Sequence, residues 1–173
     1  MSIQVPVIEY SLLNSNKLYI PAYASDGASG VDLVAAESIL IPAQETKIVP
    51  TGLLVAIPWG FEGQVRPRSG LALKEGLTVL NTPGTIDSDY RGEIKVLIYN
   101  TSKEAKRVQK GDRFAQLVIS PVAKAKFQLV EALTPTSRAD GGFGSTGIRE
   151  LDSGLVVSQS PNSEDEGGPK DRD

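Results

Sequence analysis

The chain has 173 residues, and its 18 Lys and Arg stand against 21 Asp and Glu, which gives a net charge of −3. It contains no cysteine and no histidine. These absences exclude disulfide bonds, thiolate and Ser-His nucleophiles, and metal sites built on imidazole or thiolate ligands. An enzyme of this composition would use a carboxylate as its base, and any metal would be a hard cation held by oxygen ligands.

The composition also argues against two kinds of partner. The charge provides no basic surface for a nucleic acid backbone, and only 6% of the residues are aromatic, which leaves few platforms for stacking bases. No apolar run approaches the roughly 20 residues that span a bilayer, and the first ten residues do not form a secretory signal. We therefore expect a soluble protein of the cytoplasm that binds neither nucleic acid nor membrane.

The composition changes near Glu150, which indicates one domain followed by a tail. Between residues 150 and 173 seven acidic side chains stand against one Lys and one Arg, a balance of −5, whereas residues 1–149 carry +2. Because residues 159–173 contain no aromatic residue and little apolar surface, we predict a disordered acidic tail at 150–173. A body of about 150 residues can bury enough surface to fold without disulfides or a structural metal.

The body consists of short segments rich in β-branched and aromatic residues, separated by Gly, Pro and Asn, and this pattern predicts strands. In one of them, Ile94, Val96 and Ile98 share a face, as in a half-buried strand. The segment from Ser69, a favourable N-cap residue, to Gly76 predicts one short helix. The expected class is all-β, as a sandwich, jelly roll or barrel. The predicted strands lie at 30–36, 46–50, 52–58, 76–80, 93–100, 113–119 and 126–132.

The first segment that could carry chemistry precedes the predicted helix. Arg66, Arg68, Ser69 and Gly70 bring two guanidinium groups and a hydroxyl to the start of a helix. Backbone N–H groups and the helix dipole both favour negative charge there, so the segment suits an anion. A capped helix with two solvated arginines accounts for the same residues.

The second segment runs from Asn81 to Gly92 and contains two turn sequences, so we predict a hairpin between the strands at 76–80 and 93–100. Asp87 and Asp89 are two residues apart, which suits either metal binding or plain solvation. Asp87 follows an apolar residue, a setting in which a carboxylate can be partly desolvated and act as a base. A solvated turn is the alternative.

The third segment, 138–147, contains four glycines around Ser145 and Thr146, and it can present N–H groups and hydroxyls to phosphate oxygens. It is not a Walker A loop, because Ile148 stands where that loop needs Lys. Phe143 belongs to either a linker or a lid whose ring stacks on a planar ligand. Two weaker candidates are Asp32 and Gln116, which are polar residues within apolar strands.

In this order and at these spacings, five segments resemble the motifs of the trimeric dUTPase family, the deoxyuridine triphosphate diphosphatases. They lie at 28–35, 66–74, 81–96, 111–117 and 138–147, and the resemblance covers residues 3–147. It implies a jelly-roll-like β-clip fold with one short helix, assembled as a homotrimer whose sites lie between subunits. It also implies three regions: a catalytic core at 1–137, a mobile Gly-rich arm at 138–149 and the acidic tail at 150–173.

The resemblance further implies Mg²⁺-dependent hydrolysis of dUTP to dUMP and pyrophosphate, which limits uracil in DNA and supplies dUMP for dTMP synthesis. By match, Asp87 would be the base that activates water for attack on the α-phosphorus, and Asp32 would support Mg²⁺ through water. Tyr90 would pack under the deoxyribose and Phe143 on the uracil ring. The substrate-binding residues implied are Arg68, Ser69, Gly70, Asn81, Thr85, Ile86, Tyr90, Lys95, Gln116, Arg138, Phe143, Gly144, Ser145 and Thr146.

One departure from the family pattern is Ala139, which stands where the arm usually has glycine. If this residue needs a positive φ, alanine costs about 1 kcal/mol there and slows closure of the arm.

Three other functions remain open. A dCTP deaminase or a bifunctional relative shares the fold, although the hairpin at 81–87 and the arm with its Phe favour the diphosphatase. A non-catalytic regulatory protein on this fold would have damage at Asp87, Arg68 or Tyr90, and all three are present. A nucleic-acid-binding β domain would need the basic surface that this chain lacks.

Overall fold

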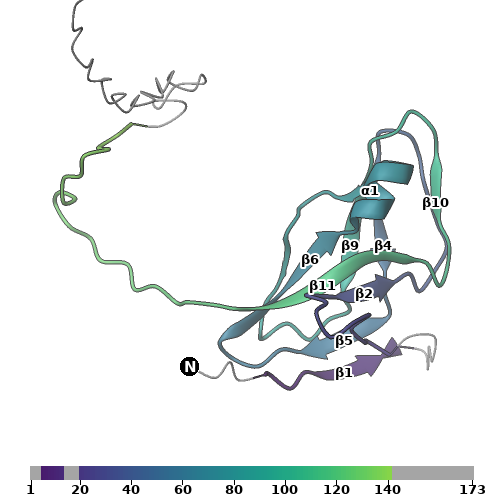
Figure 1. Ribbon diagram of the computed structural model, residues 1–173, viewed down its shortest axis with the longest axis horizontal. Coiled ribbons are helices and arrows are strands. Elements are labelled where there is room, and N and C mark those ends of the chain that lie inside the picture. The colour runs from purple at the N-terminus through teal and green to yellow at the C-terminus, as the bar shows by residue number, and fades with distance from the viewer. Residues whose placement is uncertain (1–4, 14–19, 142–173) are drawn as a thin grey trace, which may run out of the picture. The chain divides into compact units, whose positions relative to one another are not determined.

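The computed structural model describes residues 5–13 and 20–141 (Figure 1). Contacts divide the chain into two compact units, residues 1–126 and 127–173, and each is described by itself. None of the helices in the described part of the chain is long and apolar enough to cross a membrane.

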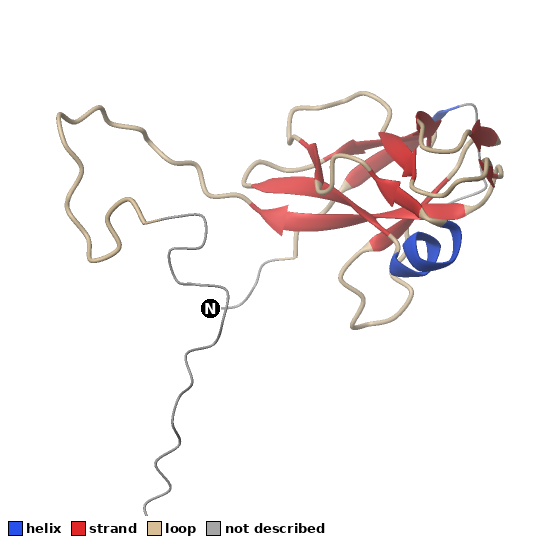
Figure 2. Ribbon diagram, turned by 90° about the horizontal axis from the view of Figure 1, so that it is seen from above, coloured by secondary structure: helices blue, strands red, loops and turns tan. Residues whose placement is uncertain are grey.

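Strands make up most of the regular structure of the first unit (Figure 2). A single α-helix is found among its described residues, so the all-β class with one short helix is confirmed. The elements in chain order are β1 (Glu9–Leu12), β2 (Val31–Val34), β3 (Ile39–Ile41), β4 (Thr46–Pro50), β5 (Leu53–Ala56), β6 (Phe61–Pro67), α1 (Ser69–Glu75), β7 (Leu77–Val79), β8 (Gly84–Ile86), β9 (Lys95–Asn100), β10 (Lys106–Val108) and β11 (Arg113–Pro121).

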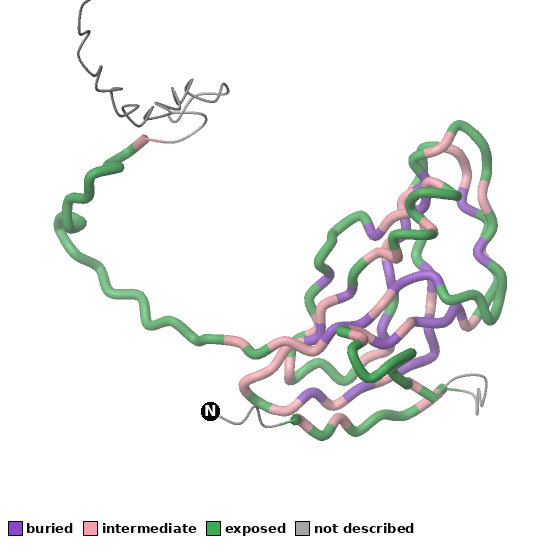
Figure 3. Tube along the Cα trace, viewed as in Figure 1, coloured by how far each residue is buried: buried purple, intermediate pink, exposed green. Residues whose placement is uncertain are grey.

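The strands form four antiparallel sheets around one hydrophobic core. The two larger sheets have the orders β2-β11-β6-β8 and β4-β9-β7, and two-stranded ribbons join β1 to β5 and β3 to β10. All four sheets contribute side chains to the core, which includes Val65 and Leu117 from one large sheet and Val49 and Ile98 from the other. Figure 3 shows short buried stretches interspersed with half-buried and exposed ones along the chain trace.

The strand prediction at 126–132 is wrong, because this segment is irregular and exposed. Its apolar residues gave a strand-like pattern, but Phe127 is 95% exposed and Leu129 is 99% exposed. A strand needs a neighbour for its backbone groups, and none of the described residues pairs with this segment.

The helix begins one residue earlier than the sequence predicts, because the predicted N-cap is Ser69. Arg68 is the N-cap residue and Ser69 is already helical, and no side chain caps the first turn. Gly76 ends the helix in the left-handed conformation, at φ 67°, as predicted. A Cβ atom at Gly76 would also lie 2.8 Å from Thr101 Oγ1, so glycine is needed for the close approach of the following loop as well.

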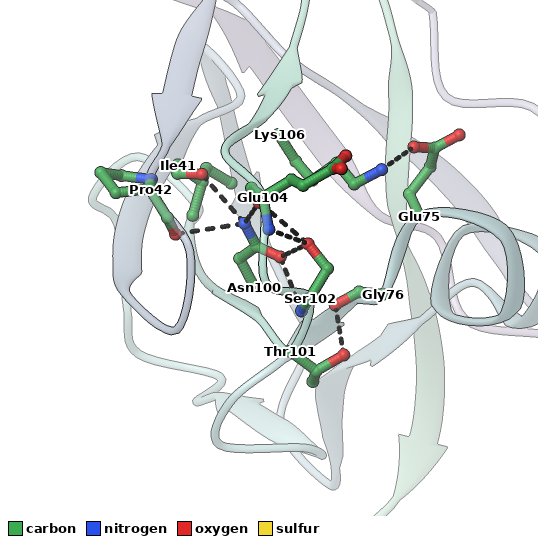
Figure 4. A network of polar contacts seen from close by, with 9 residues as sticks. All are labelled: Ile41, Pro42, Glu75, Gly76, Asn100, Thr101, Ser102, Glu104 and Lys106. Carbon is green, nitrogen blue, oxygen red and sulfur yellow. Dashed lines mark hydrogen bonds and ion pairs between the residues drawn. The ribbon is translucent and has the colours of Figure 1, made fainter.

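The end of the helix is tied to a buried polar network centred on Asn100 (Figure 4). The Asn100 amide is fully buried and donates to the carbonyl oxygens of Ile41, Pro42 and Glu104 at 2.7–3.1 Å. Its Oδ1 accepts from Ser102, and the next residue, Thr101, donates its hydroxyl to the carbonyl of Gly76 at 2.9 Å. One side chain therefore fixes the loops around the C-terminal end of α1.

The connection between β7 and β9 differs from a simple hairpin, because it contains the additional strand β8. The two strands do pair, with Thr78 opposite Tyr99. Between them, however, β8 crosses to the other large sheet and pairs with β6, with Thr85 opposite Gln64. The segment 80–94 therefore links the two larger sheets.

Candidate active site

One face of the four-stranded sheet brings together polar side chains from distant parts of the chain. Gln116 of β11 lies opposite Asp32 of β2 on one side and opposite Arg66 of β6 on the other. Directly opposed residues of an antiparallel pair point to the same face, so these three side chains form a row. Leu33, Leu117 and Val65 occupy the opposite, buried face.

Gln116 has the partner that a half-buried amide needs. Its Nε2 donates to the carbonyl of Pro67 at 3.1 Å, immediately before Arg68. A Cβ atom at Gly30 would lie 3.0 Å from the Leu117 carbonyl and 2.9 Å from Val118, so only glycine lets the chain leading into β2 approach β11 this closely.

Asp32 is held between two arginines at the edge of this row. Its Oδ1 lies 3.1 Å from Arg68 Nε, and its Oδ2 lies 3.2 Å from Arg113 Nη1. Arg68 and Arg113 also line a cavity of about 510 Å³. Its other charged lining residues are Lys106, Arg107, Glu75 and Asp112, so cations outnumber anions. The cavity therefore has the charge that an anionic ligand requires.

Arg113 is the residue of this group that the sequence reasoning missed. The register of β11 against β2 shifts between Arg113 and Ala115, which is a β-bulge. Phe114 and Ala115 are consecutive and both buried, so the alternation of the strand breaks at this point. The only sequence signal was an arginine at the start of an otherwise apolar strand, and that signal does not predict a bulge.

A second group of candidate residues lies at the end of β8. Thr85 and Ile86 belong to the strand, and Asp87 follows it directly and is exposed in the single chain. The Tyr90 N–H donates to the Asp87 carbonyl at 3.1 Å, which closes a turn. Asp87 and Asp89 line a smaller cavity of about 230 Å³ together with Trp59 and Lys124.

The remaining predicted residues are placed as follows. Asn81 is exposed beside Gly84, and Lys95 pairs with Glu93 at 3.5 Å. In the second unit, Arg138 Nε donates to the Gly141 carbonyl at 2.8 Å. Ala139 has a positive φ of 44°, the conformation in which alanine is less favourable than the glycine usual at this position. Phe143, Gly144, Ser145 and Thr146 lie outside the described residues, as does the predicted tail at 150–173.

The structure thus forms two groups in the first unit. Asp32, Arg68 and Gln116 belong to one, and Asp87 and Tyr90 belong to the other. The cavity lined by Arg68 and the cavity lined by Asp87 share no lining residue. Within residues 5–13 and 20–141 no cluster of three or more acidic side chains could hold a metal ion by itself.

A family model described as dUTPase matches residues 16–147, which is most of the chain. The chain belongs to the dUTPase family. Within this family, the deoxyuridine 5'-triphosphate nucleotidohydrolase of Rhizobium etli (strain CIAT 652) is 52% identical over 141 residues, covering 79% of this chain and 90% of the relative. The Wolinella succinogenes protein of the same name is 57% identical over 128 residues, covering 74% and 86%.

Solved dUTPase structures share the fold. The dUTPase of Staphylococcus bacteriophage 80alpha with dUPNHPP has a TM-score of 0.75 and 29% identity, and the match covers 82% of this chain and 99% of that chain. A mutant dUTPase of the S. aureus phage phi11, described as coordinating a structural Mg(II) ion, has a TM-score of 0.68 and 26% identity over 75% and 99% of the two chains.

Proposed function

We propose that this chain hydrolyses dUTP to dUMP and pyrophosphate in the cytoplasm. The observation that carries the proposal is the presence of Asp87, Arg68 and Tyr90 at their motif positions within the dUTPase match. The curated relatives are named for this activity, and a structural neighbour binds a dUTP analogue. The same reaction would limit uracil in DNA and supply dUMP for dTMP synthesis.

Asp87 is the base in this proposal. Its carboxylate accepts a proton from a water molecule whose oxygen attacks the α-phosphorus. The bond from the α-phosphorus to the oxygen that bridges to the β-phosphorus breaks, and pyrophosphate leaves with the electron pair. The exposed position of Asp87 after β8, on a backbone turn closed by Tyr90, supports this role because the carboxylate is reachable and its backbone is fixed.

The phosphates bind to the group around Arg68. Its guanidinium suits bidentate recognition of phosphate oxygens, and the N–H groups of Ser69 and Gly70 belong to the first helical turn, which leaves such donors without intrahelical partners. The Gln116 amide adds a polar contact for the α- and β-phosphates. In the arm, Arg138, Ser145 and Thr146 hold the γ-phosphate: the guanidinium compensates part of its charge, and the two hydroxyls donate hydrogen bonds to it.

The nucleoside binds along the segment 81–95. Asn81 and the backbone of Thr85 and Ile86 read the uracil edge, and Lys95 binds beside them. Tyr90 packs under the deoxyribose, while Phe143 and Gly144 of the arm cover the uracil ring. Aromatic rings on planar bases supply contact area and geometry without hydrogen bonds.

The residues assigned to the phosphates are compatible with a Mg²⁺ ion that arrives bound to the substrate phosphates. Magnesium in nucleotide sites keeps several waters and takes one or two carboxylates together with substrate phosphates, so the lack of an acidic cluster among the described residues is compatible with it. Asp32, whose side chain is 21% exposed beside Arg68, could hold a magnesium-bound water. The bound ion would neutralise charge on the phosphate oxygens.

The active form in this proposal is a homotrimer with sites between subunits, as the motif resemblance implies. The separation of the Arg68 and Asp87 cavities within one chain supports a site completed by another copy. Phe127, Leu129 and Leu133 of the second unit are 86–99% exposed, and apolar side chains of this kind favour contact with a partner.

Release of pyrophosphate from dUTP, measured beside release of ammonia from dCTP, tests the function. We expect pyrophosphate and no ammonia; ammonia from dCTP would instead establish the deaminase of the same fold. Asp87→Asn should keep binding of a non-hydrolysable dUTP analogue and lower turnover by at least about 100-fold, because the amide cannot take the proton. Asp89→Asn is the matched control, since Asp89 lines the same cavity and should tolerate the change within about threefold. An Asp87→Asn variant within threefold of the wild type would show that Asp87 is not the base.

A further inference from the structure

Asp32, Arg68 and Arg113 form a closed set of contacts. Both carboxylate oxygens of Asp32 are engaged, one by Arg68 and the other by Arg113. Arg68 Nη1 also donates to the backbone carbonyl of Arg113. Two nitrogens of Arg68 are therefore held. Nε contacts the Asp32 carboxylate, which Arg113 also contacts, and Nη1 contacts the backbone carbonyl of Arg113.

The β-bulge in β11 explains how Arg113 comes to this set. In a regular strand Arg113 would share a face with Ala115 and Leu117, which point into the core. Because of the extra residue in the bulge, the consecutive residues Phe114 and Ala115 both face the core. Arg113 therefore faces the side of the sheet that carries Asp32. Bulges re-aim side chains in this way beside functional sites.

The contacts leave Arg68 oriented but not neutralised. Its Nη2 group has no partner among residues 5–13 and 20–141, so two N–H donors remain for a ligand. The three side chains together carry two positive charges and one negative charge. A free arginine side chain loses rotamer entropy when it binds a ligand, and holding the side chain in advance reduces that cost.

We infer that Arg113 is a positioning residue that holds Arg68, through Asp32, in the orientation that receives the phosphates. This inference rests on the proposed function, because it assigns Arg68 to the substrate phosphates. It differs from a direct role of Arg113, whose side chain is 59% exposed and would otherwise be free to contact a phosphate itself.

A double-mutant cycle on Asp32 and Arg113 separates the two roles. Calorimetry would measure the Kd of a non-hydrolysable dUTP analogue and of inorganic pyrophosphate for the wild type, Arg113→Ala, Asp32→Asn and the double variant. If Arg113 acts through Asp32, Arg113→Ala raises both Kd values about tenfold, and the double variant binds no more weakly than Asp32→Asn alone. Arg113→Lys restores most of the affinity, because an ammonium group can still pair with the carboxylate. Thermal melts of each variant check that the fold is kept.

Lys103→Ala is the control, since Lys103 is an exposed cation that lines neither the Arg68 cavity nor the Asp87 cavity. It should change each Kd less than twofold. Additive losses in the cycle would make Arg113 a direct phosphate ligand and overturn the inference, as would an unchanged Kd for Arg113→Ala. If the wild type binds pyrophosphate but does not hydrolyse dUTP, the proposed function is refuted. The Kd values for pyrophosphate then still show whether Arg113 acts through Asp32. A wild type that binds neither probe overturns both.

Discussion

The phenol oxygen of Tyr90 donates a hydrogen bond of 2.9 Å to the backbone carbonyl of Glu93, and its ring occupies the space beside Gly92. A Cβ atom on Gly92 would lie 2.6 Å from Cζ and 3.0 Å from Cε2 of that ring. Real Cβ atoms do not approach other atoms this closely, so the position of the Tyr90 ring depends on glycine two residues later.

This relationship predicts that Gly92 sets sugar discrimination together with Tyr90. Gly92→Ala should push the ring out of place and raise the ratio of kcat/KM for UTP to that for dUTP by about tenfold, the size expected for the loss of a close steric fit. Tyr90→Ala should raise the ratio at least as much. Tyr90→Phe keeps the ring and is the control, with a ratio near that of the wild type. A ratio that stays constant in both test variants would place sugar choice elsewhere.

The buried network at Asn100 predicts a large loss of stability on truncation. Asn100→Ala removes three donated hydrogen bonds and leaves the carbonyls of Ile41 and Pro42 without this donor. We expect the free energy of unfolding in urea to fall by about 2–4 kcal/mol. Tyr99→Phe, which removes only a long contact to Gln44 at the surface, should change it by less than about 0.5 kcal/mol. Equal stability of the two variants would contradict the structural importance of the network.

The positive φ of Ala139 predicts that glycine is better at this position. Ala139→Gly should relieve about 1 kcal/mol in the turn from Arg138 to Gly141 and raise kcat/KM for dUTP up to about fivefold. Ala132→Gly, at an exposed position of the same unit without positive φ, is the control and should leave kcat/KM unchanged. A lower kcat/KM for Ala139→Gly would mean that the closed arm does not use this turn.

Deletions test the functional boundaries predicted at 138 and 150. Removing 138–173 should leave the melting temperature nearly unchanged, because the buried hydrophobic residues of the described chain all lie between Val31 and Val118. Activity should collapse, since the deletion removes Arg138 and the motif residues that follow it. Removing only 150–173 should change activity less than about twofold. Full activity without 138–173 would exclude the arm from the site, and loss of activity without 150–173 would move the boundary.

The proposed assembly predicts a mass of about three times 18.4 kDa in sedimentation equilibrium. A double change of Phe127 and Leu129 to Glu should lower the mass or weaken association, because it puts charge on exposed apolar positions. Lys103→Glu, a charge reversal in an exposed loop, is the control and should not. A wild-type monomer at micromolar concentration would refute both the trimer and the shared site.

Local pattern was sufficient for part of this fold. The alternation that put Ile94, Val96 and Ile98 on one face is confirmed, because all three are buried. The helix end at Gly76 is confirmed as well, since a left-handed C-cap is a local requirement. The N-cap prediction at Ser69 is wrong, because Arg68 takes that position and its side chain does not cap the helix.

Pairing between distant segments could not be predicted in the same way. The strand β6 contains Gly63 and Pro67, which usually interrupt strands, yet a Cβ at Gly63 would lie 2.9 Å from Ile57, so a larger residue there would displace side chains of the core. The bulge at Arg113 and the crossing of β8 to β6 depend on partners far away in the chain. The contact between Asp32 and Arg113, 81 residues apart, exists only through that pairing.

The position of Trp59 gives the protein a spectroscopic reporter of its own. This is the single tryptophan of the chain, it is 79% exposed, and it lines the same cavity as Asp87. Lys124 Nζ lies 5.5 Å from the centre of its ring, where a cation interacts with the π-electrons. A highly charged anion that draws this ammonium group away alters the electric field on the indole. The emission of the unmodified chain can therefore follow the arrival and departure of ligand beside Asp87 in real time, without a label.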